Sequence, residues 1–563
     1  MSKITFKVEG GEDVIIFAAG CDESGRSVEN VLELAHRAGV AVDAPCSGNG
    51  TCGKCRVKVL EGTLSSEFER RLDGKETEGW VLACSSKVVG DAVVFVPLTG
   101  IDRGDIDRGT VLLSNNLDRG TVPETACDYG VAIDVGTTSV SALLVDLSSG
   151  DALVSATTGN AQVRFGADVI NRIIQQQKPG GIKRLQETIV KETILPLIDN
   201  LCTTAGISSD KITRLTVAAN TTMNHLLLGV DANSIRIEPY SPAFLEFEPY
   251  NPASIGIKVA PDAKMILAPN VGSYVGGDIT AGVSAAVVGM NSNGGFDRRT
   301  VPVSTMSKRP EMTLFIDLGT NGEIVFGNNE FLMACACSAG PAFEGGEISC
   351  GMRAMDGAIE ACIIDKDTLE PHLSVIGETK PAGLCGSGLI DVVAELFRTG
   401  IINGKGKFQT QGDGIGSYVL VYAEDSAVNR DITITETDID NFIRAKGAIF
   451  SGIMSLLSPL GFSSSDIDDV LIAGGIGSGI NIKNAISIGM LPALPEEKYS
   501  YIGNSSLNGA YKMLISQEAA EEVIEIARNM TYIDLSTQPG YMDEFVAACF
   551  LPHTNETLFP TFK

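Results

Sequence analysis

The spacing of four cysteines near the amino terminus constrains this chain more than any other feature. Cys46, Cys52 and Cys55 lie within one short segment, APCSGNGTCGKC, and Cys84 follows later in WVLACSS. Four thiolates that converge from one loop and one distant position are the ligand set that plant-type two-iron centres require. Glycines in the loop allow backbone N–H groups to approach the sulfurs, where hydrogen bonds stabilise negative charge. We therefore predict that Cys46, Cys52, Cys55 and Cys84 are the ligands of a [2Fe-2S] cluster.

A zinc site is the alternative interpretation of these cysteines, because four thiolates also bind zinc tetrahedrally. Zinc ribbons pair two C-x2-C knuckles, whereas this region contains one, formed by Cys52 and Cys55. The spacing therefore favours iron. The remaining cysteines are expected to be ordinary small, partly apolar side chains.

Residues 1–95 are predicted to form the domain that holds the cluster. KITFKVEG and VIIFAAG read as two strands joined by a Gly-Gly-Glu-Asp turn. A helix is expected near Ser27 to Ala38, with apolar side chains at three-and-four spacing from Val28 to Ala35 on the face that packs on the hairpin. This order of elements predicts a small β-grasp-like fold.

Residues 96–126 lose this periodicity and read as a linker. The tripeptide Asp-Arg-Gly recurs there from residues 102, 107 and 118, which gives the segment a degenerate repeat. An extended linker of this length spans up to roughly 100 Å, enough for the cluster to visit a donor and then an acceptor. A polar arm packed on the surface remains the other interpretation.

Two later segments share one plan, and both are predicted to bind phosphate. YGVAIDVGTTSVSALLVDL and MTLFIDLGTNGEIVFG each read as an apolar strand, an aspartate, a glycine–threonine turn and a second strand. Such repetition indicates an internal duplication with a cleft between two halves. The turns direct amides and hydroxyls at phosphate oxygens, and the aspartates hold Mg2+ directly or through water. The candidate residues are Asp134, Gly136, Thr137 and Thr138 in the first segment and Asp317, Gly319, Thr320, Asn321 and Glu323 in the second.

A third segment, DVLIAGGIGSGIN, ends an apolar strand in Gly474, Gly475 and Gly477. Without side chains there, an adenine or ribose can lie against the backbone. The glycine spacing does not match the dinucleotide-binding fingerprint, and no G-x4-GK[ST] loop occurs in the chain. These observations argue against Rossmann and P-loop folds.

Charge and hydropathy narrow the range of partners. The chain has 70 acidic and 43 basic residues, and its net charge of -27 repels nucleic acid and anionic lipid surfaces. No apolar stretch approaches the about 20 residues that a membrane span needs, and the amino terminus alternates like a strand. We therefore expect a cytoplasmic protein that binds neither nucleic acid nor membrane.

The length of the chain indicates how many domains it forms. A length of 563 residues predicts three or more domains.

The three glycine-rich turns together resemble the superfamily of acetate and sugar kinases, heat-shock ATPases and actin. In that resemblance residues 134–139 are the first phosphate loop, 317–323 the second, and 473–479 the adenosine motif. An amino-terminal [2Fe-2S] module joined to this ATPase resembles the reductive activators of corrinoid proteins, the activating enzymes of corrinoid-dependent methyltransferase systems. Further similar segments include NVGSYVGGDITAG, SAGPAFEGGEISCGMRAMDGAI, GLCGSGLIDVVAELFRTGII, GNSSLNGA and EFVAACFLPHT.

The resemblance implies an α/β multidomain protein: a β-grasp [2Fe-2S] ferredoxin domain, a linker and a duplicated actin-like or sugar-kinase-like ATPase region. The expected division is residues 1–95 for the ferredoxin domain, 96–126 for the linker, 127–210 for a middle subdomain with the first phosphate loop, and 211–563 for the ATPase domain with the second phosphate loop and adenosine motif.

The resemblance also implies a reaction in which MgATP drives transfer of one electron from the cluster, reducing an inactive Co(II) corrinoid protein to Co(I). Asp134 and Asp317 would lie around Mg2+, and Glu323 or Glu344 would orient the attacking water. For Glu344 and Asp278, a turn residue or helix cap is an equally good interpretation. The expected partners are a corrinoid protein of a methyltransferase or acetyl-synthesis system and an upstream low-potential electron donor, and a homodimer is possible. A small-molecule kinase with a redox-sensing cluster and a ferredoxin-type shuttle with an inert nucleotide fold are the alternative functions.

Overall fold

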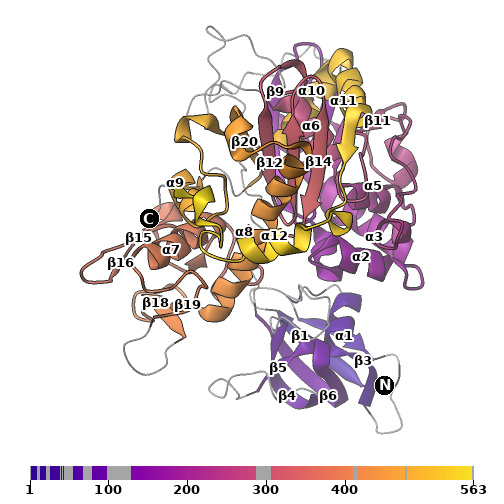
Figure 1. Ribbon diagram of the computed structural model, residues 1–563. Coiled ribbons are helices and arrows are strands. Elements are labelled where there is room, and N and C mark those ends of the chain that lie inside the picture. Colours follow the sequence, from indigo (N-terminus) through magenta and orange to yellow (C-terminus); the bar gives the residue numbers. More distant parts are fainter. Residues whose placement is uncertain are drawn as a thin grey trace.

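The computed structural model in Figure 1 shows several α/β units, coloured along the chain. It describes residues 2–8, 13–18, 20, 26–38, 40, 42, 55–66, 79–97, 128–286, 306–409, 416–475 and 479–560. The predicted linker thus lies outside the described residues, apart from its first two positions.

In its described residues, the amino-terminal unit has a six-stranded sheet, one helix and a core of its own. Its strands are β1 (Lys3–Val8), β2 (Val14–Phe17), β3 (Arg26–Asn30), β4 (Arg56–Ser66), β5 (Trp80–Leu82) and β6 (Ser86–Val96). The order is β2-β1-β6-β4-β5, with β3 also paired to β6, and β1 runs parallel to β6. The predicted β1–β2 hairpin is confirmed. Ile4 and Phe6 point inward from β1 and join the core of the unit, as a strand with one buried face requires.

The helix predicted from Ser27 to Ala38 begins later than expected. Residues Arg26–Asn30 form β3, and the helix α1 is Val31–Arg37. Asn30 accepts a hydrogen bond from the Glu33 amide at 2.8 Å, and the Glu33 carboxylate accepts one from the Asn30 amide at 3.0 Å. This reciprocal capping fixes the helix start at Val31. Val28, expected on the buried helix face, is 61% exposed on the strand.

The rest of the chain contains two lobes built on the same sheet plan. The first lobe, residues 128–286, has the strand order β11-β10-β7-β8-β9, and the second lobe, residues 306–560, has the order β21-β20-β12-β13-β14-β22. In each lobe the first three strands form an antiparallel meander, and the next strand lies parallel to the first. The structure therefore shows the duplication that the sequence predicts. The strands are β7 (Tyr129–Val135), β8 (Ser139–Asp146), β9 (Ala152–Gly159), β10 (Ile212–Ala219), β11 (Lys264–Leu267), β12 (Thr313–Leu318), β13 (Gly322–Gly327), β14 (Leu332–Cys337), β20 (Asp469–Ala473), β21 (Tyr499–Gly503) and β22 (Met530–Tyr532).

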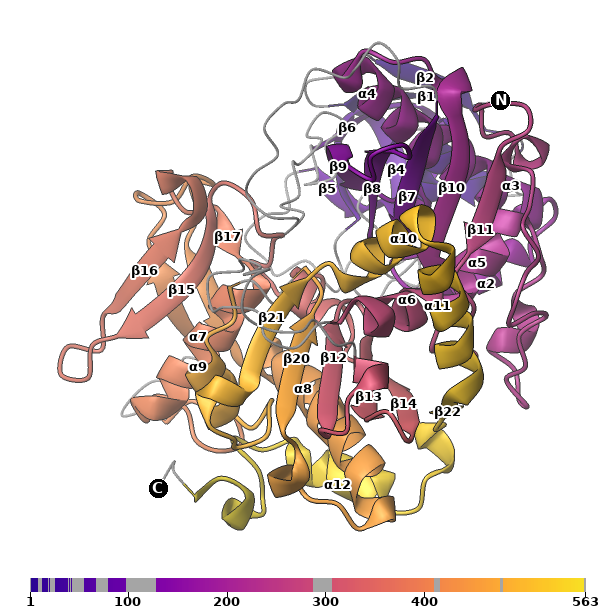
Figure 2. The same ribbon diagram turned by 90° about the horizontal axis from the view of Figure 1, so that it is seen from above.

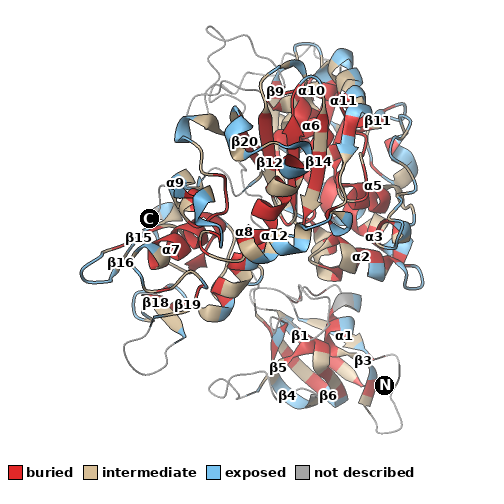
Figure 3. Ribbon diagram, viewed as in Figure 1, coloured by how far each residue is buried: buried red, intermediate tan, exposed pale blue. Residues whose placement is uncertain are grey.

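Two helices, α6 (Gly277–Ala285) and α10 (Ser505–Ile515), pack against each other between the two sheets (Figure 2). Ile279 of α6 joins the core of the second lobe, whereas Ala281 joins a cluster with strands of the first lobe. A Cβ on Gly509 would lie 2.1 Å from the Ala281 carbonyl oxygen, so this close approach requires glycine. Figure 3 shows buried residues concentrated in the sheets and in these helices.

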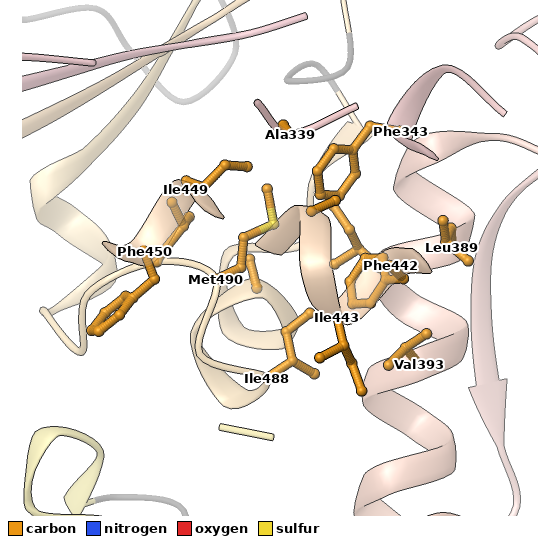
Figure 4. Close-up of a cluster of buried hydrophobic side chains, with 14 of the residues drawn as sticks. Ala339, Phe343, Leu389, Val393, Phe442, Ile443, Ile449, Phe450, Ile488 and Met490 are labelled. Atoms are coloured by element: carbon orange, nitrogen blue, oxygen red, sulfur yellow. The ribbon is translucent and has the colours of Figure 1, made fainter. Parts of the chain in front are cut away.

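The helix α11 (Gln517–Asn529) packs on α6 and α10, and its Val523 and Ile526 join the same two clusters. A further subdomain is inserted between β14 and β20. In the subdomain, Phe343 packs edge-on against Phe442 with ring centroids 5.7 Å apart, beside Leu389 and Val393 (Figure 4). Its elements are β15 (Ala358–Ile364), β16 (Pro371–Val375), β17 (Gly383–Leu384), α7 (Gly386–Arg398), β18 (Ser417–Val421), β19 (Ile432–Thr435) and α8 (Glu436–Leu457). The remaining helices are α2 (Val169–Gln176), α3 (Gly181–Ile189), α4 (Leu195–Ala205), α5 (Thr221–Leu228), α9 (Ile482–Ser487) and α12 (Tyr541–Ala548).

The first-lobe sheet includes strands from both sides of residue 210, where the sequence analysis divides the ATPase region. β10 pairs with β7 along most of its length, so one continuous sheet contains strands from both sides of residue 210. The division at residue 210 stays a prediction. Within the described residues, no helix is long and apolar enough to cross a membrane.

Candidate functional site

Two of the four predicted cluster ligands meet in the amino-terminal unit. The Cys55 sulfur lies 3.2 Å from the Cys84 sulfur, although the two residues come from opposite ends of the β4–β5 region. The Ala83 amide donates to the Cys55 carbonyl at 2.7 Å and fixes this approach. Both cysteines are enclosed, with exposed fractions of 1% and 9%. Two thiols converging in this way fit the ligand set of an iron–sulfur cluster, and Cys46 and Cys52 lie outside the described residues.

A cavity of about 640 Å³ lies between the two lobes and takes in both predicted phosphate loops and the adenosine motif. Its volume falls in the range of cofactor sites. Every predicted nucleotide residue that the structure describes lines it, and Gly477 lies outside the described residues. These residues are Asp134, Gly136, Thr137, Thr138, Asp317, Gly319, Thr320, Asn321, Glu323, Gly474 and Gly475.

Four of the carboxyl groups that line this cavity have raised pKa values. Enclosure by protein raises the pKa of Asp134 to about 6, of Asp317 to about 7 and of Asp278 to about 8, and neighbouring aspartates add to the increase at Asp317 and Asp278. Burial, followed by the charges of Asp278 and Asp317, holds the pKa of Glu323 well above its usual range. Like charges held together in this way favour a bound cation, which relieves their repulsion.

The helices α6 and α10 lie between the two sheets. Each places a polar side chain near an aspartate of the opposite lobe. Asn504, the N-cap of α10 in the second lobe, donates to the Asp134 carboxylate of the first lobe at 2.8 Å. Asp278, in the first turn of α6, belongs to the first lobe, and its strongest charged neighbour is Asp317 of the second lobe. The carboxyl groups therefore sit at a junction that depends on how the lobes are placed.

Among the described residues, no three His, Cys, Asp or Glu side chains are arranged to hold a metal ion by themselves. Magnesium usually keeps several waters and is bound by one or two carboxylates together with phosphate oxygens. Asp134 and Asp317 are two carboxylates that line the cavity beside the predicted phosphate loops.

The predicted first phosphate loop accepts hydrogen bonds from the buried side chains of Arg172, Asn160 and Asn220. Arg172 Nη2 donates to the Thr137 carbonyl, and Arg172 Nε donates to the Gly166 carbonyl at 2.8 Å. Asn160 donates to the Gly136 carbonyl at 2.9 Å, and Asn220 donates to the Thr137 hydroxyl at 3.0 Å. Burial lowers the pKa of Arg172 to about 9, so the side chain remains charged at neutral pH. These contacts fix the loop before any ligand binds.

Replacing Arg172 with methionine is expected to destabilise the first lobe by about 2–5 kcal/mol, because two buried carbonyl groups lose their donor. Thermal unfolding of the full chain measures this loss. Arg184→Met, on the exposed face of α3, is the matched control and should change the unfolding temperature little. Equal unfolding temperatures for the Arg172 variant and wild type would contradict the supporting role.

Gly474 joins the adenosine motif to the second phosphate loop. Its φ is +96°, and an added Cβ would lie 2.3 Å from the Leu318 carbonyl oxygen and 2.8 Å from an Asp317 oxygen. Only glycine fits here. The Tyr501 hydroxyl donates to the Gly474 carbonyl at 2.9 Å, and both residues line the cavity.

The raised pKa values predict that the nucleotide-free protein loses stability as pH increases. In the unfolded chain these carboxyl groups titrate near about 3.9 to 4.3, well below their folded values. The folded state therefore binds more protons, and the stabilisation present below about pH 4 is lost as pH rises through about 6 to 8. Asp278→Asn removes the charge without changing the shape, so it should raise the unfolding temperature at pH 8 more than at pH 5. An equal change in the unfolding temperature at both pH values would show that the charge of the Asp278 carboxylate does not destabilise the fold.

Sequence reasoning undervalued several residues that line this cavity. The sequence is equally consistent with Asp278 as a helix cap. Asn504 has only the signal of an asparagine before an apolar helix, which predicts an N-cap and no contact with Asp134. Arg353 carried no local signal, because it follows an irregular glycine-rich stretch. Thr138 and Thr320, both predicted, meet across the cleft with hydroxyl oxygens 3.0 Å apart and share the Glu344 carboxylate.

Comparisons with known proteins agree with this architecture. Residues 20–89 match the family described as the 2Fe-2S iron-sulfur cluster binding domain, residues 129–292 the RACo middle region, and residues 311–563 the C-terminal domain of RACo, the ASKHA domain. The chain is 32% identical to the corrinoid activation enzyme RamQ of Eubacterium limosum, over 78% of this chain and 74% of that one. It is 23% identical to the [Co(II) methylated amine-specific corrinoid protein] reductase of Methanosarcina barkeri, over 72% and 73% of the two chains.

A solved structure supports the same relationship over the full length. The reductive activator for corrinoid, iron-sulfur protein is 37% identical, with a TM-score of 0.69 and complete coverage of both chains. Its match extends from the amino-terminal cluster unit to the carboxyl terminus. On these grounds this chain belongs to the family of reductive activators of corrinoid proteins.

Proposed function

We propose that this protein is an ATP-dependent iron–sulfur reductase that activates a corrinoid protein by reducing Co(II) to Co(I). The observation that carries the proposal is the cavity in which two phosphate loops from duplicated lobes face each other, in a chain that also holds a ferredoxin-type cysteine pair. The relatives act on corrinoid proteins by name. Their similarity spans the cavity and not only the cluster unit.

The amino-terminal unit would hold the cluster through Cys46, Cys52, Cys55 and Cys84. When bound, a [2Fe-2S] cluster supplies one electron at a time near about -400 mV. We expect the Co(II)/Co(I) couple of the partner to be more negative, so that transfer is uphill by about 2.3 kcal/mol for each 100 mV. A low-potential donor must then reduce the protein again after each transfer.

The two lobes would supply the missing free energy through nucleotide binding and hydrolysis. Asp134 and Asp317 would position Mg2+, while Thr137, Thr138, Thr320 and Asn321 and the backbone of Gly136 and Gly319 would hold phosphate oxygens. Burial, with the nearby charges of Asp278 and Asp317, raises the pKa of Glu323, which suits this carboxyl group to exchange a proton with the attacking water. Gly474, Gly475 and Gly477 would leave space for the adenosine.

Nucleotide binding can affect the corrinoid protein only if it changes the contacts between the two lobes. Asn504 and Asp278 reach across the junction from opposite lobes, so a cation that neutralises Asp134 and Asp317 changes contacts in both. A lobe movement of this kind would favour one conformation of the bound Co(II) partner, because a ligand shifts an equilibrium by its differential affinity for the two states.

The test is an anaerobic reduction assay with purified Co(II) corrinoid protein. The reduced protein is added with and without MgATP, and the visible spectrum of the corrinoid is followed. Co(I) should form rapidly with MgATP and slowly or not at all without it. Equal rates in the two arms would support a plain electron shuttle, and phosphorylation of a small acceptor without any corrinoid would support a kinase.

A further inference from the structure

The hydroxyls of Thr138 and Thr320, one from each lobe, already share an anionic partner. Thr138 Oγ1 donates to Glu344 Oε2 at 2.8 Å, and Thr320 Oγ1 donates to Glu344 Oε1 at 2.8 Å. One carboxylate therefore bridges both predicted phosphate loops. Because a threonine hydroxyl has a single proton to donate, neither hydroxyl can donate to a phosphate oxygen while Glu344 stays in place.

Glu344 would compete with a phosphate group for the hydroxyls of Thr138 and Thr320. A carboxylate and a phosphate are both anions, and at hydrogen-bond distance in an enclosed cavity they repel strongly. Both would also compete for the same two protons. A phosphate bound to Thr138 and Thr320 must therefore displace the Glu344 side chain.

The backbone around Glu344 is anchored, so the displacement falls on its side chain. Phe343 packs edge-on against Phe442 in the core of the inserted subdomain (Figure 4). The Ser349 amide donates to the Asp438 carboxylate at 2.7 Å and ties the following turn to α8. Because the Glu344 side chain has several staggered rotamers, we expect its rotation to free both hydroxyls without a movement of the backbone.

Arg353, nine residues after Glu344, is the basic side chain found among the described residues that line this cavity. The carboxylates lining it with Arg353 are Asp134, Asp278, Asp317, Glu323, Glu344 and Glu360. Arg353 Nη1 lies 4.0 Å from the place where a Cβ on Gly159 would stand, so the guanidinium reaches from the second lobe to the edge of the first. In the part of the chain that the structure describes, no hydrogen bond or ion pair is found for Arg353. An unpaired guanidinium in an acidic cavity is suited to a phosphate, which it can bind through two parallel N–H groups.

We propose that Glu344 and Arg353 exchange roles around the terminal phosphate of the nucleotide. When a nucleoside triphosphate binds, its terminal phosphate takes the Thr138 and Thr320 hydroxyls, Glu344 rotates away, and Arg353 binds the phosphate from the opposite side. A nucleoside diphosphate lacks that phosphate and leaves Glu344 in place. Glu344 and Arg353 thereby distinguish a nucleoside triphosphate from a diphosphate. The difference reaches both lobes, because Thr138 and Thr320 belong to different lobes. The inference rests on the nucleotide binding in the proposed function and adds the residues that read the phosphate state.

The test is calorimetric binding of a non-hydrolysable MgATP analogue and of MgADP to the full chain. Glu344→Gln keeps the size and can still accept hydrogen bonds, but it removes the repulsion, so it should bind the triphosphate analogue about tenfold more tightly. Arg353→Gln should weaken the analogue about tenfold or more, and Arg353→Lys less. All three variants should bind MgADP within about threefold of wild type. Glu347→Gln, an exposed change on the same segment, is the matched control and should alter neither affinity.

Near-UV circular dichroism and bound iron show whether each variant is folded, and Arg353→Lys keeps the test informative if Arg353→Gln unfolds. The inference is overturned if Arg353 variants weaken the binding of both nucleotides equally, or if Glu344→Gln leaves the affinity for the analogue unchanged.

The binding experiment contains no corrinoid, so it can be separated from the proposed function. Selective binding changes without any later Co(II) reduction would contradict the proposed function alone. Normal nucleotide-dependent Co(II) reduction with unchanged variant affinities would contradict this inference alone. Failure of wild type to bind either nucleotide would overturn both.

Discussion

Asp317→Asn is expected to lower MgATP hydrolysis by at least about 10²-fold while leaving the protein folded. Asp317 lies where the second phosphate loop meets Asp134, Asp278 and Gly474, and an amide cannot hold Mg2+ as a carboxylate does. Because enclosure already raises the pKa of Asp317 to about 7, asparagine resembles the protonated form that the nucleotide-free fold tolerates. The variant should therefore unfold at a temperature no lower than that of wild type.

Phosphate release measured under anaerobic conditions gives the rate. Asp425→Asn, on the exposed surface of the inserted subdomain, is the matched control and should retain full hydrolysis. Hydrolysis by the Asp317 variant within about threefold of wild type would remove Asp317 from the magnesium site. The same loss in the control would instead indicate a general effect of the substitutions.

Cys84→Ala is the second change with a large expected effect, and it should abolish cluster binding. Cys84 lies 3.2 Å from Cys55, sulfur to sulfur, and its removal leaves three thiolates for a centre that requires four. Bound iron and the visible absorption of the cluster should both be lost after reconstitution. Nucleotide binding should persist, because the amino-terminal unit has a core of its own.

Cys350→Ser tests whether the loss is specific to the cluster cysteines. Cys350 is partly exposed in the inserted subdomain, and its replacement should leave iron content unchanged. A Cys84 variant that still binds iron and keeps its spectrum would contradict the assignment. Bound zinc in place of iron in anaerobically purified wild type would favour the alternative reading of the four cysteines.

Local sequence signals predicted the hairpins that carry the two candidate phosphate loops, because each hairpin is defined by a few neighbouring residues. An apolar strand ending in aspartate, followed by glycine and threonine, forms the same hairpin in both lobes, β7–β8 and β12–β13. The apolar segment that ends in Gly474 likewise formed β20, beside β12. The duplication was visible because both copies retain the Asp-x-Gly-Thr pattern.

Contacts between distant segments could not be read in this way. The Asn504–Asp134 hydrogen bond joins residues 370 positions apart, and it exists because α10 crosses between the sheets. Thr138 and Glu344 are 206 positions apart, and nothing near either residue indicates the other. The start of α1 was also misplaced, because the apolar spacing from Val28 to Ala35 outweighed the capping signal at Asn30 and Glu33.

The central claim is that an electron held by the amino-terminal cluster reaches cobalt only when nucleotide acts on the two lobes. A single-turnover measurement tests it most directly: protein reduced once and freed of excess reductant is mixed rapidly with Co(II) corrinoid protein and MgATP. The account predicts that the cluster is oxidised at the rate at which Co(I) appears, with no more than one Co(I) per cluster. Formation of Co(I) while the cluster stays reduced, or at the same rate when MgATP is omitted, would contradict it.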